Sequence, residues 1–156
     1  MSRLRKAWRV RSPWQETWQG EIIFSSTASK ARYQGFLSAS EYDDDLKIID
    51  MSVKRARPDD VSLPDRHDLA ASISPKALEC LLHATGANEP WRVPTGSRNA
   101  FYASENDPEM IELMQYGLME NTKRGWEKGS VYFRATALGL EVAKSCEPLY
   151  QYEAAA

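Results

Sequence analysis

The stretch YGLMENTKRGWEKGSVYFRATALG, residues 116–139, decides the fold that the sequence predicts for the second half of the chain. Residues 118–122 and 131–135 are two short strand-forming segments on either side of a charged tip. Thr136 then supplies a helix cap. The stretch therefore predicts a β-hairpin with a basic tip, followed directly by a helix. The apolar residues that we expect this helix to carry are Leu138, Val142 and Ala143.

Two more helices and a strand are expected before the hairpin. Ser74 is a natural N-cap, Pro75 suits the first helical position, and Gly86 suits the C-terminal cap. The buried stripe of this helix is expected to be Leu78, Leu81, Leu82 and Thr85. Residues 98–104 predict a short strand, and a helix is expected at about 107–117. Its expected apolar stripe is Met110, Ile111, Met114 and Leu118.

The first half of the sequence predicts a β-β-α-β order. The segments with strand character are Trp8–Val10, EIIFSS at 21–26, and LKIIDMSVKRA at 46–56. Between the second and third strands, Ser26 or Thr27 can cap a helix over about 28–42. One helix face is small, which would let its backbone lie close to the sheet, with larger residues on the flanks. The small residues are Ala28, Ala31, Gly35 and Ala39, and the flanking ones are Phe36 and Leu37.

Composition and charge predict a soluble α+β protein with two domains. The 156 residues are 42% hydrophobic and carry a net charge of −2. Residues 1–57 form the β-β-α-β module with a balance of +4, and residues 58–74, with four aspartates and two prolines, are expected to be an exposed linker. Residues 75–153 form the second domain, with a balance of −3 over 75–156. Residues 154–156, three alanines, are expected to be an expression-vector remnant.

The cellular setting expected from the sequence is the cytoplasm. Cys80 and Cys146 fit no metal or redox spacing, which favours free thiols in a reducing compartment. The basic N-terminus is followed by no apolar stretch, and no segment approaches the roughly 20 apolar residues that span a bilayer. We therefore expect neither a secretory signal nor a membrane contact.

The residues that could support catalysis do not converge. His67 and His83 lie in different segments, where a turn and a solvated helix face are expected, although Glu79 lies one turn from His83. Consecutive carboxylates at Asp43–Asp45 point in diverging directions, which does not suit Mg²⁺ binding. Phosphate-cradling glycine loops, nucleophile elbows and zinc-binding helices are absent from the sequence. We therefore expect no enzyme activity, no metal site and no cofactor.

The hairpin tip carries the candidate contact residues: Lys123, Arg124, Lys128 and Trp126. Glu127 offsets one of the three positive charges, and Arg134 projects from the second strand opposite Val131 and Phe133. Trp126 would either anchor a partner or fold back onto its own domain. The tip would likewise either contact phosphate or only close the hairpin.

The helix before the hairpin argues against double-stranded DNA. It carries Asp107, Glu109 and Glu112 but no Lys or Arg, so phosphates would repel it. The same acidic face, with Glu109 and Glu112 as candidate contact residues, would be a natural mimic of phosphate.

The order of elements over Met110–Ala143 resembles a winged helix. IELMQYGLM resembles the helix-then-strand passage of such domains, and ATALG resembles the Thr-x-x-Gly that ends the wing. A helix-turn-helix needs two helices before the wing, whereas residues 87–105 contain Pro90, Pro94 and Gly96. The resemblance therefore implies a degenerate winged-helix-like domain.

Most of the chain is similar to small uncharacterised proteins of phages and prophages. The segments that carry this similarity are ASKARYQGFL, RNAFYAS, MQYGLM and VYFRATALG. The leading hypothesis is a non-catalytic phage or prophage accessory protein in the host cytoplasm. It would bind a host macromolecule, preferably a protein, and inhibit a host defence or regulatory complex. The alternative is a nucleic-acid-binding regulator that uses the basic N-terminal half and the wing-like hairpin.

Overall fold

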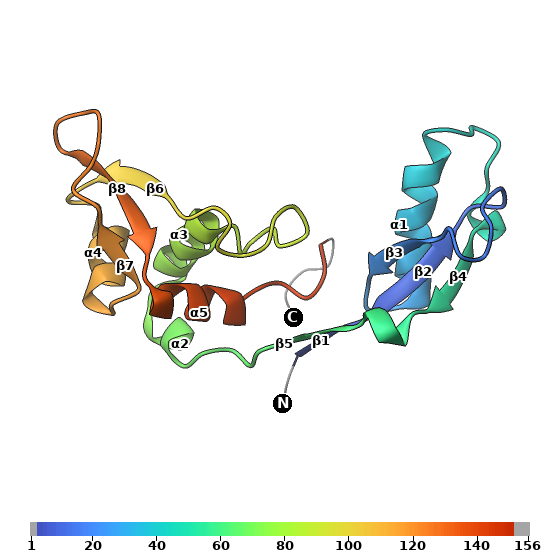
Figure 1. Ribbon diagram of the computed structural model, residues 1–156, viewed down its shortest axis with the longest axis horizontal. Helices are drawn as coiled ribbons and strands as arrows, with labels where there is room; N and C mark the ends of the chain where they lie inside the picture. The colour runs from blue at the N-terminus through green and yellow to red at the C-terminus, as the bar shows by residue number, and fades with distance from the viewer. Residues whose placement is uncertain (1–2, 152–156) are drawn as a thin grey trace. The chain divides into compact units, whose positions relative to one another are not determined.

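The computed structural model describes residues 3–151, and their contacts form two compact units (Figure 1). We call residues 3–62 with 149–151 the N-terminal unit and residues 63–148 the C-terminal unit. Both contain helices and antiparallel strands, so the expected α+β class is confirmed. The three alanines at 154–156 lie outside the described residues.

A three-stranded antiparallel sheet covered by one helix forms the N-terminal unit. The strand order is β3 (Glu21–Phe24), β2 (Ala7–Arg11) and β4 (Ser52–Arg55), with Trp8 opposite both Ile23 and Arg55. Helix α1 (Ala28–Ser40) begins at Thr27, whose side chain accepts a hydrogen bond from the Lys30 backbone N–H. The third strand is shorter than expected, because residues 48–50 form the 3-10 turn η1 (Ile48–Asp50).

The small face of α1 is buried against this sheet, as the sequence predicts. Ala31, Gly35 and Ala39 are buried, and a Cβ built on Gly35 would lie 2.5 Å from Val10 Cγ1. Only glycine permits this approach of helix to strand. Phe36 packs on the core as expected, whereas Leu37 is exposed, which corrects its assignment to a packed flank.

A two-stranded ribbon of β1 (Arg3–Arg5) and β5 (Val61–Leu63) was not expected. The chain reaches β5 through the 3-10 turn η2 (Arg57–Asp59). Residues 149–151 also return to the N-terminal unit, where the buried Tyr150 hydroxyl accepts a hydrogen bond from the Lys6 N–H. Both features join segments far apart in the sequence, so no local pattern predicts them.

Residues 58–74 differ from the exposed linker that the sequence predicts. Leu63, Ala70 and Ile73 are buried, and residues 69–72 form the short helix α2 (Leu69–Ser72). The segment is therefore divided between the two units. Its aspartates look solvated in the sequence, yet Asp60 accepts hydrogen bonds from the Ala7 backbone and the Arg55 side chain.

The C-terminal unit has a three-stranded antiparallel sheet with helices packed on one face. The strand order is β6 (Phe101–Ser104), β8 (Ser130–Ala135) and β7 (Met119–Asn121). The helices are α3 (Pro75–Thr85), α4 (Pro108–Gln115) and α5 (Ala137–Ser145). Ser74, Gly86 and Thr136 cap α3 and α5 as predicted, with Gly86 in the left-handed region. Between β6 and β7 the chain forms the one helix α4, as expected.

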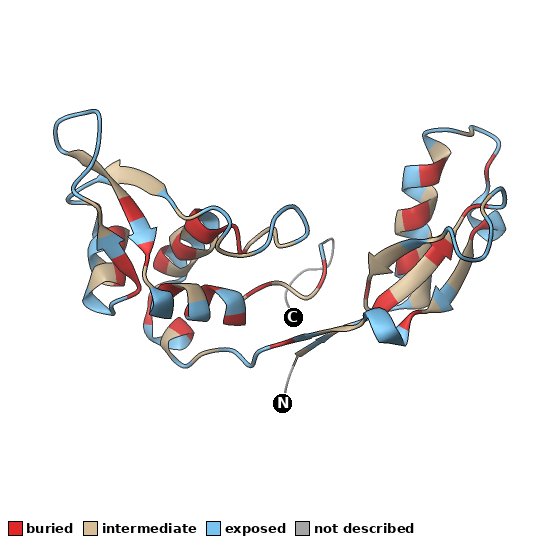
Figure 2. Cartoon of the chain, viewed as in Figure 1, coloured by how far each residue is buried: buried red, intermediate tan, exposed pale blue. Residues whose placement is uncertain are grey.

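Buried residues gather on helices α3, α4 and α5 and on strands β7 and β8 (Figure 2). Phe133 of β8, Leu81 of α3 and Leu113 of α4 are fully buried. Helix α5 packs closely against the backbone at Leu118, just before β7, since a Cβ on Gly139 would collide with the Leu118 carbonyl oxygen. This contact explains why the capped helix that follows the hairpin needs a glycine in its first turn.

In two helices most of the expected apolar residues pack in the core, including Met110 and Met114 of α4 and Val142 and Ala143 of α5, but one residue of each set is exposed. In α4 the buried residues are Met110 and Leu113, whereas the expected Ile111 is exposed. Leu118 is buried as expected, but it follows the helix after Gly117, which has a positive φ of 69°. In α5, Leu138 is exposed rather than buried.

Candidate functional site: the hairpin face

The hairpin is held in one conformation by hydrogen bonds inside its loop, residues 122–129. Tyr132 donates its N–H to the Arg124 carbonyl at 2.7 Å, and Thr122 Oγ1 donates to the Tyr132 carbonyl at 2.7 Å. Lys123 sits at a φ of 56° with its N–H bonded to Asn121 Oδ1. The loop backbone therefore lies against β8. A Cβ on Gly125 would collide with the Ser130 carbonyl, so this position also requires glycine.

Three aromatic rings gather on the outer face of the sheet. Tyr102 of β6 and Tyr132 of β8 are direct cross-strand partners, with ring centroids 4.8 Å apart. Trp126 of the loop lies edge-to-face on Tyr102, at 5.8 Å and 90°, and 6.5 Å from Tyr132. The Tyr102 hydroxyl also accepts a hydrogen bond from the Glu127 N–H. Trp126 is thus oriented by its neighbours while 80% of it remains exposed.

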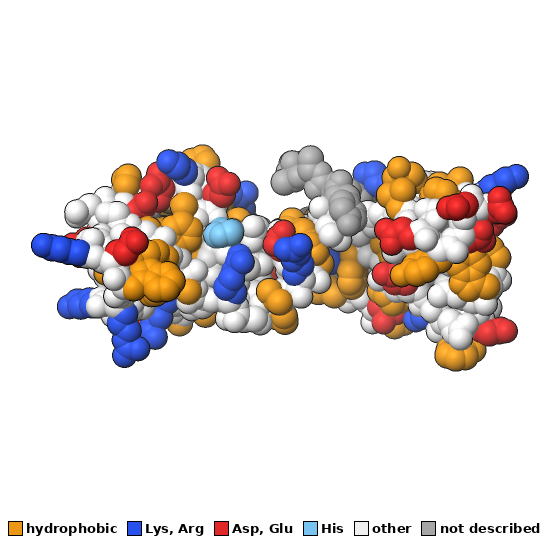
Figure 3. Space-filling model, turned by 90° about the horizontal axis from the view of Figure 1, so that it is seen from above, with side chains coloured by type: hydrophobic (Ala, Val, Ile, Leu, Met, Phe, Trp, Pro, Cys, Tyr) orange, Lys and Arg blue, Asp and Glu red, His pale blue; other side chains and the backbone are white. Residues whose placement is uncertain are grey.

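Positive side chains surround these rings. Lys123, Arg124 and Lys128 are exposed, and none forms an ion pair with another of residues 3–151. Figure 3 shows Lys and Arg side chains beside a hydrophobic patch where the C-terminal unit carries the hairpin, on the left of the view. Arg134 is different, because its Nε is bonded to Glu120 on β7. We call the three aromatic rings with these three unpaired cations the hairpin face.

A shallow groove of about 490 Å³ runs beside the rings along the hairpin. Its walls include Arg124, Tyr132 and Arg134, together with Glu120 and Asn121. The groove therefore combines one aromatic ring with cationic and hydrogen-bonding side chains.

The predicted acidic contact residues are placed elsewhere and are used inside the unit. Glu112 accepts hydrogen bonds from the Ser74 N–H at 2.7 Å and from Ser74 Oγ at 2.8 Å. Glu109 pairs with Lys76 at 3.0 Å, and this hydrogen bond lowers the pKa of the Glu109 carboxyl. These two carboxylates tie α4 to the start of α3. Glu109 and Glu112 are not part of the hairpin face. The acidic side chains that we expected α4 to offer a partner are bonded instead to Ser74 and Lys76 at the start of α3.

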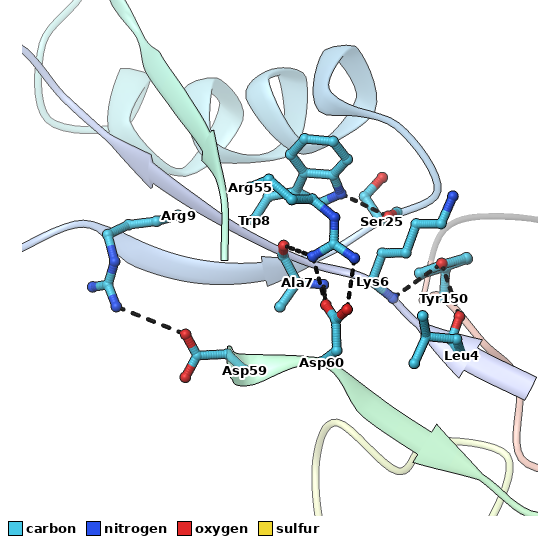
Figure 4. A network of polar contacts seen from close by, with 10 residues as sticks. All are labelled: Leu4, Lys6, Ala7, Trp8, Arg9, Ser25, Arg55, Asp59, Asp60 and Tyr150. Atoms are coloured by element: carbon cyan, nitrogen blue, oxygen red, sulfur yellow. Dashed lines mark hydrogen bonds and ion pairs between the residues drawn. The ribbon is translucent and has the colours of Figure 1, made fainter. Parts of the chain in front are cut away.

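The basic N-terminal half also uses its arginines internally (Figure 4). Arg55 forms two hydrogen bonds to Asp60, at 2.5 and 2.7 Å, and donates a third to the Ala7 carbonyl. Its guanidinium lies over the Trp8 ring at 5.3 Å. Arg9 donates to the Gly20 carbonyl at 3.0 Å and pairs with Asp59 at 3.9 Å. Arg9 and Arg55 therefore contribute little to an open basic surface in this half.

The histidines and the aspartate run have local structural contacts. His67 Nδ1 accepts the Leu69 N–H at the start of α2, and the exposed His83 ring meets the edge of Phe101. Asp43–Asp45 forms a turn in which Asp43 Oδ1 accepts the Asp45 N–H. Among residues 3–151, no three His, Cys, Asp or Glu side chains cluster as metal ligands would. No helix in the same residues has the length and apolar character to cross a bilayer.

Sequence reasoning identified the loop residues of the hairpin face but missed Tyr102 and Tyr132. Each lies next to a residue that packs in the core, Phe101 or Phe133. The signal that would have found them is the alternation along each strand, because neighbours of a buried residue point to the opposite face. Comparison of the chain with protein-family models, curated proteins and solved structures found no match.

Proposed function

We propose that this chain is a non-catalytic binding protein and that the hairpin face is the surface that contacts its partner. The observation that carries the proposal is the position of Trp126. This ring is 80% exposed, yet Tyr102 and Tyr132 orient it and a hydrogen-bonded loop supports it. An oriented aromatic ring that costs little entropy to immobilise is typical of the residues that dominate binding energy.

A protein partner is the candidate that the sequence favours. Tryptophan and arginine are enriched among the residues that dominate protein–protein affinity, and Trp126 and Arg124 lie in one loop. Mimicry of phosphate by the acidic residues of α4 gives a protein partner less support, because Glu109 and Glu112 are bonded to Lys76 and Ser74. Phage or prophage origin, a winged-helix relationship and inhibition of a host complex stay predictions that rest on the sequence resemblance.

A nucleic-acid partner is the second candidate, favoured by one specific observation. The exposed ring of Trp126 and the three unpaired cations Lys123, Arg124 and Lys128 belong to the same loop. Arg9 and Arg55 of the N-terminal half are engaged inside their own unit, which favours the hairpin face for this function.

The test uses Trp126→Ala and Trp18→Ala in the full chain as immobilised baits in a bacterial lysate, with and without nuclease. Trp18 is a matched control, because it is 74% exposed and belongs to the N-terminal unit. We expect Trp126→Ala to lose the partner that the unmodified chain and Trp18→Ala retain. Equal capture by all three baits would show that the hairpin face is not the contact surface.

A further inference from the structure

We propose that the ligand of the hairpin face is single-stranded nucleic acid, whose bases stack on Trp126 and Tyr132 while its phosphates meet the loop cations. This inference rests on the proposed function, because it names the partner of the same face. It follows from three properties of the face: its rings, its charge and the elements around it.

The rings offer stacking surfaces on a sheet. Trp126 lies at an interplanar angle of 90° to Tyr102, and 80% of it is exposed, so most of the indole surface is open to a stacked base. Tyr132 lies 6.5 Å from Trp126 between centroids and also lines the groove of about 490 Å³. Aromatic side chains of this kind hold unpaired bases regardless of sequence, because every base has a flat π-face.

The charge on the same face suits a phosphate chain. Lys123, Arg124 and Lys128 lie within six residues of one another, and their charges are not neutralised by ion pairs within residues 3–151. Arg124 also lines the groove beside Tyr132. A protein partner would need both an acidic surface and a pocket for the indole, whereas a single strand supplies phosphates and rings together.

The surrounding elements exclude the duplex that a winged helix would bind. Helix α4 precedes the hairpin and carries Glu109 and Glu112 with no Lys or Arg of its own. Its carboxylates bond to Lys76 and Ser74, so this helix offers no free cation to the phosphates of a major groove. In addition, bases in a duplex are stacked on each other and cannot cover Trp126.

The test measures binding of the full chain to fluorescein-labelled 12-nucleotide oligothymidine and oligouridine, and to a 12-base-pair duplex, by fluorescence anisotropy. We expect both single strands to bind more tightly than the duplex. Each phosphate neutralised on a single strand contributes about −0.7 to the slope of log K against log [salt]. Three cations therefore predict a slope of about −2.

Two variants test the contacts and two matched variants serve as controls. We expect Trp126→Ala to weaken single-strand binding roughly 5-fold or more, since one stacked base is lost. The double change Lys123→Gln and Arg124→Gln should make the salt slope less negative by about 1.4, for two phosphate contacts. Trp18→Ala and Lys54→Gln, in the N-terminal unit, should leave affinity and slope unchanged.

Three results would overturn the inference. The first is a duplex that binds as tightly as the single strands, and the second is single-strand binding that Trp126→Ala leaves unchanged. The third is capture of a protein that depends on Trp126 and survives nuclease treatment, by a chain that binds no oligonucleotide. That result would leave the proposed function intact. If neither a macromolecule from the lysate nor an oligonucleotide depends on Trp126, the proposed function fails as well.

Discussion

The two units of this chain are stabilised in different ways. In the C-terminal unit, fourteen of the described residues form one buried apolar cluster around Phe133 and Leu81. The corresponding cluster of the N-terminal unit has five. Polar contacts supplement the smaller core, because Arg55, Asp60 and the Ala7 backbone form a connected network beside it (Figure 4).

This difference follows from the residues available to each unit. Helix α1 presents Ala31, Gly35 and Ala39 to its sheet, so it approaches closely but buries little apolar area. Hydrophobic stabilisation scales with that area at roughly 25 cal/mol per Å². The N-terminal unit therefore depends more on close backbone packing and on hydrogen bonds to charged groups. Changes of the same kind should have different effects in the two units.

The largest effect is expected in the apolar core of the C-terminal unit. Phe133→Ala removes a fully buried ring between the helices and the sheet. We expect it to lower the free energy of unfolding of this unit by about 3–5 kcal/mol. Hydrogen exchange followed by mass spectrometry separates the two units, and protection should fall in residues 63–148. The control is Tyr132→Ala, one residue away on the outer face, and a loss as large in that variant would contradict this description of the core.

A smaller loss is expected where α1 meets its sheet. Gly35→Val places a branched side chain 2.5 Å from Val10 Cγ1, and Val10 is itself buried. Overpacking of this kind costs about 1–3 kcal/mol. Ser29→Val, at an exposed position of the same helix, controls for the helix propensity of valine. Chemical unfolding monitored by hydrogen exchange in residues 3–62 should show the loss only in Gly35→Val.

The sequence predicted this close packing because the cause is local. Small residues at helical spacing in α1, caps at Ser74 and Thr136, and the turn at the hairpin all depend on neighbours within a few positions. The β1–β5 ribbon and the return of Tyr150 depend on segments more than 50 residues apart, which no periodicity encodes. Burial in residues 58–74 was missed for the same reason, since the aspartates suggested solvent while Asp60 pairs with the distant Ala7 backbone.

For the candidate site, the sequence predicted the loop residues of the hairpin face but not the two sheet tyrosines, Tyr102 and Tyr132, that Trp126 contacts. Lys123, Arg124 and Trp126 are conspicuous in a short charged tip. Tyr102 becomes part of the face only because β6 pairs with β8 and places it opposite Tyr132. The acidic residues of α4 were assigned to a partner surface because their contacts with α3 are tertiary.

Acid should weaken the polar network of the N-terminal unit. Hydrogen bonds from Arg55 and from the Ala7 backbone lower the pKa of Asp60 to about 2, from an ordinary value of 3.8. Because the folded pKa is the lower one, the stabilising contribution is present above about pH 4 and is lost as the pH falls toward 2. In Asp60→Asn this contribution is missing at every pH.

The measurement is the free energy of unfolding from pH 7 to pH 2 for the unmodified chain and Asp60→Asn. Their difference should be largest above pH 4 and should shrink toward pH 2. Asp59→Asn is the control, because Asp59 lies 3.9 Å from Arg9 and is more exposed than Asp60. A difference that does not change with pH would mean that Asp60 acts through packing rather than charge.

The smallest effect on stability is expected on the hairpin face, where the largest effect on binding is proposed. Trp126 makes ring contacts with Tyr102 and Tyr132, but 80% of it lies outside the packed structure. Substitutions at such exposed positions usually change the free energy of unfolding by no more than about 0.5 kcal/mol. We therefore expect Trp126→Ala and Trp18→Ala to unfold alike, by chemical denaturation followed with circular dichroism.

This small effect separates the two interpretations of the hairpin. If Trp126 served to close the loop, its removal would free residues 122–129 and expose the Tyr102 and Tyr132 rings beneath it. The stability loss would then exceed about 1 kcal/mol, as for an aromatic pair that contributes to packing. If Trp126→Ala keeps its stability and loses its partner, the fold orients the indole for contact with that partner. Loss of both together in Trp126→Ala, with Trp18→Ala unaffected, would show that the ring belongs to the fold and that the contact surface lies elsewhere.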